Sequence, residues 1–143
     1  MKIMSRVLLA PVLLALPCAA YCADLGAATQ AVVTHHLRAS AAADLEGVMS
    51  DYAANAIVIS PQGVLRGTAQ IRAFFTDFYR TNAAMASGLK LQRQVSEGEV
   101  GYISYVLNEG GKDQLFGSDT YIVHKGKIAV ETVVSVPSAA AAK

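Results

Sequence analysis

His36 and Asp119 are the two side chains whose types and positions could carry chemistry in this sequence. His36 lies at the centre of the apolar face of a predicted helix, and a histidine can donate or accept a proton near neutral pH. Asp119 lies in a predicted strand between Phe116 and Tyr121, among otherwise uncharged residues. Two-residue periodicity places it on the same face as Tyr121. If that face is buried, we expect the pKa of Asp119 to be raised.

Both residues also have a purely structural interpretation. Asp119 could be a strand-edge carboxylate that accepts hydrogen bonds from backbone amides or from Thr120, since a carboxylate inside a strand is costly unless it is partnered. His36 could be a core or pocket-wall histidine satisfied by one hydrogen bond. The sequence leaves both interpretations open.

A second group of residues is expected to form the wall of a pocket around these two side chains. Each of them could instead serve only in core packing, as buried aromatic residues commonly do. They are Tyr52, Ser60, Phe75, Tyr105 and Tyr121.

Metal, cofactor and nucleic-acid binding have little support in the sequence. His35 and His36 are adjacent and so point in different directions on a helix, and no other His, Asp or Glu cluster has the spacing of a ligand set. We therefore expect no metal and no other cofactor. No Lys/Arg cluster occurs, and there is no basic stripe with interleaved aromatics, which argues against nucleic acid as a partner.

Three helices are predicted in the N-terminal half of the chain. Residues 24–42 place Leu25, Val33 and His36 on one apolar face. Asp44 is suited to cap a short helix that ends near residue 51. A long helix begins near Thr68, with one apolar stripe that we expect to pack against a sheet: Ile71, Phe74, Phe75, Phe78 and Tyr79.

About six strands are predicted from β-branched runs and two-residue periodicity. Residues 56–60 and 64–66 read as a hairpin around Pro61 and Gly63, and the later strands are 89–97, 100–108, 114–124 and 127–136. Their short connections contain glycine and suit tight reversals. We predict an α+β fold in which a cone-shaped, bent antiparallel sheet wraps over the three helices and leaves a hollow end.

Several segments resemble the nuclear-transport-factor-two-like superfamily, and within it the SnoaL-like and ketosteroid-isomerase-like branches. They are residues 43–49 (ADLEGVM), 60–67 (SPQGVLRG), 71–75 (IRAFF) and 117–123 (GSDTYIV). The resemblance covers nearly all of residues 30–136. It implies the fold more firmly than the function, because this fold hosts isomerases, cyclases, dehydratases and binding domains without chemistry.

The resemblance also implies roles for three positions. In isomerase-like members a carboxylate base moves a proton while a tyrosine and a protonated aspartic acid donate to the developing oxyanion. Asp119 falls at the position of the acid, and His36 falls at the position of the tyrosine. Ser60 stands where those members carry the aspartate base, and a serine cannot abstract a carbon-bound proton without a base of its own.

The N-terminal segment is typical of an export signal. Lys2 and Arg6 precede an apolar run from Val7 to Leu16, which is too short to span a bilayer. We expect residues 1–23 to be a signal peptide cut within about residues 20–23, residues 24–137 to form one domain, and residues 138–143 to be a disordered tail. Cys18 and Cys22 are the only cysteines. The mature protein would be periplasmic or secreted, without a membrane span.

Two functions follow as expectations. The first is the binding of a small, largely apolar molecule in the hollow of the cone, without turnover. The alternative is an isomerase, cyclase or dehydratase that uses Asp119 and His36. Under either function we expect a homodimer formed through the open face of the sheet.

Overall fold

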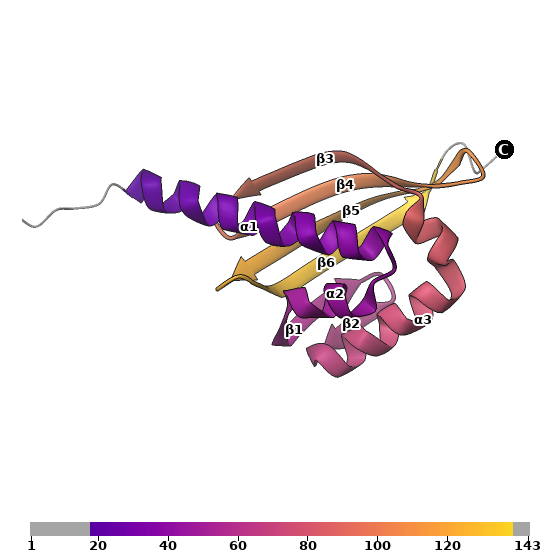
Figure 1. Cartoon of the computed structure of the whole chain (residues 1–143), viewed down its shortest axis with the longest axis horizontal. Helices are drawn as coiled ribbons and strands as arrows, with labels where there is room; N and C mark the ends of the chain where they lie inside the picture. The colour runs from indigo at the N-terminus through magenta and orange to yellow at the C-terminus, as the bar shows by residue number, and fades with distance from the viewer. Residues whose placement is uncertain (1–17, 139–143) are drawn as a thin grey trace, which may run out of the picture.

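The computed structural model describes residues 18–138, except for the side chains at 18–23, 83–87 and 109 (Figure 1). Most of the expected signal peptide and of the expected tail, residues 1–17 and 139–143, lies outside this range. The first helix, α1 (Cys18–Ala41), begins before the expected residue 24. In the part of the chain that the structure describes, no helix is both long and apolar enough to cross a membrane.

The other two helices follow the predicted signals closely. α2 (Leu45–Asp51) is capped by Asp44, whose side chain accepts a hydrogen bond from the backbone N–H of Gly47 at 3.0 Å. That bond satisfies one of the free amides of the first turn. α3 (Gly67–Ser87) has one residue with non-helical backbone angles, Asn82, three residues beyond the last aromatic side chain, Tyr79.

Six strands form one curved sheet, as predicted. They are β1 (Tyr52–Ser60), β2 (Gly63–Arg66), β3 (Leu89–Glu97), β4 (Val100–Glu109), β5 (Lys112–His124) and β6 (Lys127–Pro137). Their order across the sheet is β2-β1-β6-β5-β4-β3. The prediction of a wholly antiparallel sheet needs one correction, because β1 and β6 run parallel. Hairpin signals between neighbours in sequence cannot show this pairing, because 66 residues separate the two strands.

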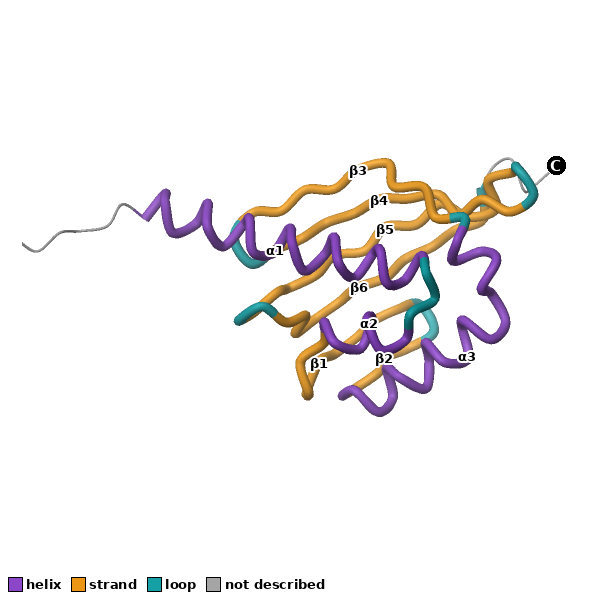
Figure 2. The backbone as a smooth tube through the Cα atoms, in the orientation of Figure 1, coloured by secondary structure: helices purple, strands orange, loops and turns teal. Residues whose placement is uncertain are grey.

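All three helices lie against one face of the sheet (Figure 2). α1 contacts β3, β4 and β5, whereas α3 contacts β1, β2 and β4. α1 approaches β4 closely because Gly101 has no side chain: a Cβ there would lie 2.8 Å from Val33 Cγ2. The core between the layers is apolar, and its most deeply buried members include Val33, Val48, Ala56, Ile71, Ile103 and Ile128.

The aromatic stripe of α3 is only partly core, which corrects the sequence-based expectation. Ile71, Phe75 and Tyr79 are buried, but Phe74 is 47% exposed and Phe78 is half-buried. The stripe is therefore split along its length, with one side packed in the core and the other side less covered. Phe74 and Phe78 instead border an open space inside the cone.

Candidate functional site

A cavity of about 440 Å³ lies between the helices and the concave face of the sheet. Its mouth is formed by exposed residues, among them Gln62 of the β1–β2 turn, Val64 and Phe74. Its side walls are mainly apolar, and its closed end is formed by five buried side chains that carry polar atoms. These five are His36, Tyr105, Asp119, Tyr121 and Glu131.

Asp119 lies at this closed end with a phenol at each of its carboxyl oxygens. The Tyr105 hydroxyl donates to Oδ1 at 3.3 Å, and the Tyr121 hydroxyl donates to Oδ2 at 3.2 Å. Burial and the nearby Glu131 carboxyl raise the pKa of Asp119 to about 8, although the two phenol hydrogen bonds oppose that shift. The acid is therefore largely protonated at neutral pH, in the direction that the sequence predicted for an inward-facing Asp119.

The missing side chain of Gly117 leaves the space that the Tyr105 phenol occupies. Tyr105 on β4 lies directly opposite Gly117 on β5, and a Cβ at position 117 would lie 2.5 to 2.7 Å from the end of the tyrosine ring. The ring can therefore lie across the neighbouring strand and reach Asp119, two residues farther along. Burial is the main cause that raises the pKa of Tyr105, so its hydroxyl keeps its proton and acts as a donor.

Glu131 on β6 is a site residue that the sequence reasoning missed. It is 3% exposed, lines the cavity and accepts a hydrogen bond from the Tyr52 hydroxyl. Burial raises the pKa of Glu131, while His36 and the Tyr52 hydrogen bond act in the opposite direction. The cavity therefore ends in two carboxyl groups, where one was expected.

A β-bulge explains why Glu131 was missed. Ile122 pairs with Val130, but the next residue of β5, Val123, pairs with Ile128, so Ala129 is an extra residue in β6. Strict two-residue alternation from the buried Ile128 would point Glu131 toward the opposite face. The extra residue switches the face, so that Ile128 and Glu131 are both buried on the concave side.

His36 reaches the closed end of the cavity from α1. Its ring makes edge contacts with Tyr52, Phe75 and Tyr121, with ring centroids 5.3, 6.2 and 5.6 Å away. Its Nδ1 atom lies 3.5 Å from Oδ2 of Asp51, too far for a well-formed hydrogen bond, and makes no hydrogen bond to another described residue. Because the side chain is 4% exposed, this nitrogen is withdrawn from bulk water.

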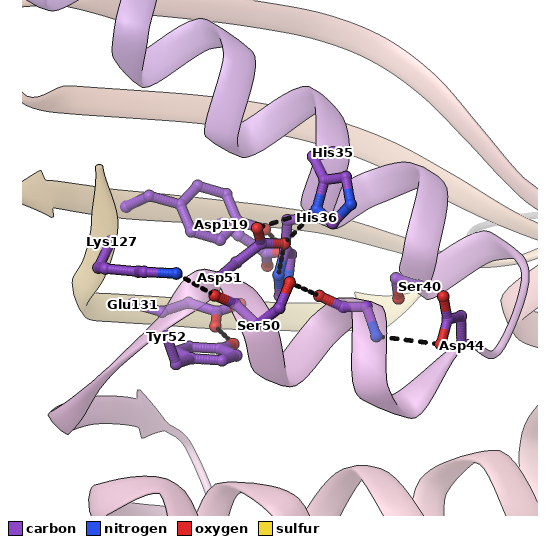
Figure 3. A network of polar contacts seen from close by, with 12 residues as sticks. His35, His36, Ser40, Asp44, Ser50, Asp51, Tyr52, Asp119, Lys127 and Glu131 are labelled. Carbon is purple, nitrogen blue, oxygen red and sulfur yellow. Dashed lines mark hydrogen bonds and ion pairs between the residues drawn. The ribbon is translucent and has the colours of Figure 1, made fainter.

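Asp51, at the end of α2, joins the buried histidine to an exposed one (Figure 3). His35 Nδ1 lies 2.9 and 3.0 Å from the two oxygens of Asp51, and the His35 side chain is 56% exposed. Burial of Asp51 works against its charge, but the contacts with His36 and His35 outweigh it and hold its pKa below the usual range. The sequence reasoning missed Asp51, since only its position as the last residue of a helix was visible.

The remaining predicted wall residues divide into two groups. Ser60, Phe75, Tyr105 and Tyr121 line the cavity together with His36 and Asp119. Tyr52 does not line it: the ring is buried behind Glu131, to which its hydroxyl donates. The Ser60 hydroxyl accepts from the backbone N–H of Gln62 at 3.3 Å, within the β1–β2 turn.

The charges of the wall limit what the cavity can hold. Its described lining includes two carboxyl groups and one imidazole, but no Lys or Arg. Within the described residues, no group of three or more His, Cys, Asp or Glu side chains could hold a metal ion. The closed end can donate hydrogen bonds from protonated acids, accept them from ionised ones, or exchange a proton with a bound molecule.

Solved structures with this architecture share little sequence with the chain. An NTF2-like protein of unknown function from Burkholderia xenovorans LB400 is 20% identical, with 78% of this chain and 85% of that one covered and a TM-score of 0.67. A SnoaL-like protein of unknown function from Burkholderia thailandensis E264 is 17% identical, with coverage of 78% and 95% and a TM-score of 0.63. An LEH-like epoxide hydrolase from M. tuberculosis is 13% identical, with coverage of 78% and 84% and a TM-score of 0.61. These likenesses support the fold alone.

The family model of the SnoaL-like domain matches residues 33–131, which include every buried polar residue at the closed end of the cavity. Among curated proteins, none matches the chain. The family match, the cone of helices and curved sheet, and the neighbouring structures agree with the resemblance seen in the sequence. The chain therefore belongs to the SnoaL-like domain family of the nuclear-transport-factor-two-like superfamily.

Proposed function

We propose that this protein binds a small, largely apolar molecule in the cavity, with a polar group of that molecule directed to Asp119 and Glu131. One observation carries the proposal: a mainly apolar cavity of about 440 Å³ ends in buried carboxyl groups. A few convergent polar groups in an apolar cavity are the usual design of a small-molecule site. The SnoaL-like family is consistent with such binding.

Binding without turnover is the simpler form of this function. Ser60 occupies the position at which, by resemblance, isomerase-like members carry their aspartate base. Its hydroxyl is held within the β1–β2 turn, where it accepts from the Gln62 amide. In the described structure the hydrogen-bond partners of the Ser60 hydroxyl are backbone groups of Gln62 and Gly63. None of these partners is a carboxylate that could activate the hydroxyl.

The proposal is tested by filling the cavity. Val133 lines the cavity, and its neighbour Val134 lies on the opposite face of β6 and is 46% exposed. We expect the rigid ketone adamantan-2-one to bind wild type and Val134→Phe alike in calorimetry, and Val133→Phe to abolish the binding. Equal binding by both variants would place the probe outside the cavity and contradict the proposal.

Acid–base catalysis is the second candidate, and the pKa of Asp119 favours it. A buried acid with a pKa of about 8, beside Glu131 and His36, suits proton transfer near neutral pH. The reaction would be an isomerisation, cyclisation or dehydration, with Asp119 as the acid and His36 as its partner. Cyclohexanone in D2O provides a test: this function predicts faster exchange of its α-hydrogens with wild type than with Asp119→Asn, whereas equal rates would contradict it.

Export to the periplasm or the medium is a further part of the proposal. It rests on the positive start and short apolar run of residues 1–16. We expect intact-mass measurement of protein from the envelope or medium to show loss of about 20 to 23 residues, as signal-peptide length predicts. Recovery of the full-length chain from the cytoplasm would contradict export.

We also propose that two copies pair through the convex face of the sheet. This face carries exposed apolar side chains on four strands, among them Val95, Val100, Phe116, Val134 and Val136, each 42 to 50% exposed. Large exposed apolar patches commonly mark interfaces. Light scattering during gel filtration is expected to give twice the monomer mass, and a monomer at high concentration would contradict pairing.

A further inference from the structure

The closed end of the cavity gathers two carboxyl groups, and its described lining holds no Lys or Arg to balance them. Asp119 and Glu131 both face the cavity and are 7% and 3% exposed. No Lys or Arg is among the described lining residues, and the one basic group there, His36, has its Nδ1 atom toward Asp51. Two buried carboxyl groups with no cation are expensive to ionise.

Three phenols nevertheless direct their hydroxyls at these two acids. Tyr105 and Tyr121 donate to the two oxygens of Asp119, and Tyr52 donates to Glu131. Hydrogen bonds of this kind stabilise the ionised form of a carboxyl group. The three phenols supply hydrogen-bond donors to the two carboxyl groups but no positive charge. A cation beside them is what a pair of ionised carboxylates would still need.

The walls beside the acids are aromatic. Phe75, Tyr105 and Tyr121 line the cavity together with the His36 ring. The face of an aromatic ring attracts an organic cation, most strongly where water is excluded. The same walls offer nothing to an anion, which the two acids would repel.

We infer that the bound molecule is an organic cation, an apolar body with one ammonium group that pairs with Asp119 and Glu131. This inference rests on the proposed function, because it assigns the chemical class of the molecule in the same cavity. An ammonium ligand differs from a neutral ketone, because a ketone would need the acids in their protonated form as hydrogen-bond donors.

Ammonium and ketone ligands predict opposite pH dependences. Without a ligand, burial and the nearby Glu131 carboxyl raise the pKa of Asp119 to about 8, and burial raises the pKa of Glu131. A bound ammonium favours the carboxylates, so binding at pH 7 releases a proton and the affinity rises with pH up to about 8. A ketone that accepts a hydrogen bond from a protonated Asp119 loses affinity over the same pH range.

The other titratable groups facing the two acids are His36, Tyr52, Tyr79, Tyr105 and Tyr121.

A series of adamantane derivatives tests the charge at constant shape. The probes are 1-aminoadamantane, adamantan-2-one and adamantane-1-carboxylate, measured by calorimetry in two buffers of different ionisation enthalpy. We expect the ammonium probe to bind at least about tenfold more tightly than the ketone. We also expect it to release a proton at pH 7 and the carboxylate not to bind.

Single charge-removing variants provide the control. We expect Asp119→Asn and Glu131→Gln each to weaken ammonium binding at least about tenfold while changing ketone binding by less than about threefold. Asp77→Asn removes the same charge from an exposed position on α3, where Asp77 pairs with Arg80, and should leave both probes unaffected. If a variant does not fold, the proton release and pH dependence of wild type decide the question.

Three results would overturn the inference. If the ketone binds as tightly as the ammonium probe, or if ammonium binding releases no proton at pH 7, the ligand class is wrong while the cavity remains a binding site. If no probe binds to folded wild type at any pH between 6 and 9, the inference fails together with the proposed function.

Discussion

At the residue scale, the protonation of Asp119 couples stability to pH. Its pKa in the folded protein, about 8, lies above the usual value of 3.8. Between these values the folded state binds more protons than the unfolded state, so the free energy of unfolding falls as pH rises. We expect wild type to lose about 1–4 kcal/mol relative to Asp119→Asn from pH 5 to pH 8.5. Urea melts at both pH values measure this change, and parallel curves for the two proteins would contradict the raised pKa.

Asp51 has the opposite character, because its contacts with the histidines favour its charged form. Asp51→Asn weakens its interactions with both His35 and the buried His36. We expect it to lower the free energy of unfolding by about 1–3 kcal/mol at pH 7. Because the folded pKa of Asp51 is lowered, its contribution is lost only as pH falls below the usual range of aspartate. The exposed Asp77→Asn is the control, and an equal effect of both changes in urea melts would contradict this role of Asp51.

The sequence was sufficient to predict some site residues and not others. The positions of His36 and Asp119 follow from one helix face and one regular stretch of strand, where periodicity holds. Glu131 lies beyond a bulge, and Asp51 reaches His36 only because α2 folds back along α1. The positions of Glu131 and Asp51 depend on how elements pair and pack against one another. The spacing of residues within one element carries no information about that packing. The catalytic roles assigned to His36 and Asp119 stay predictions.

At the element scale, α3 places two adjacent phenylalanines in different environments. Phe75 is buried, whereas Phe74 is 47% exposed at the mouth of the cavity. We expect Phe75→Ala to cost about 3–5 kcal/mol of stability and Phe74→Ala less than about 1 kcal/mol. Phe74→Ala should still weaken the binding of adamantan-2-one, since it removes part of the cavity wall. Urea melts and calorimetry measure the two effects, and similar stability losses would show that α3 is rotated from its described position.

Most elements could be predicted because local signals mark their ends. Asp44 caps α2 as expected, and the Lys125–Gly126 turn, with backbone φ angles of 50° and 73°, forms the reversal predicted between the last two strands. The exposure of Phe74 could not be predicted. A helical stripe shows which residues share a face, but only the curvature of the sheet decides how much of that face is covered.

At the scale of the whole molecule, the convex face of the sheet determines the expected assembly. Val134→Lys places a charge within the exposed apolar patch, and we expect it to weaken self-association at least about tenfold. Thr76→Lys adds the same charge on the exposed side of α3 and should leave the mass unchanged. Light scattering over a concentration series measures both, and a dimer that persists in Val134→Lys would place the interface elsewhere.

The overall fold could be predicted because the order of helices and strands is distinctive and the matched segments are spaced along nearly the whole domain. The parallel contact between β1 and β6 could not be predicted, because 66 residues separate the two strands. The dimensions of the cavity could not be predicted either, because they depend on how far the sheet bends. The central claim nevertheless concerns that cavity: it holds a small apolar molecule whose polar group meets Asp119 and Glu131.

Native mass spectrometry of protein purified from the organism that makes it tests this claim most directly. We expect wild type and Val134→Phe to carry one small molecule per chain, and Val133→Phe, in which the new ring occupies the cavity, to carry none. If wild type carries no molecule, or if Val133→Phe carries the same molecule in the same amount, the cavity is not the binding site that we describe.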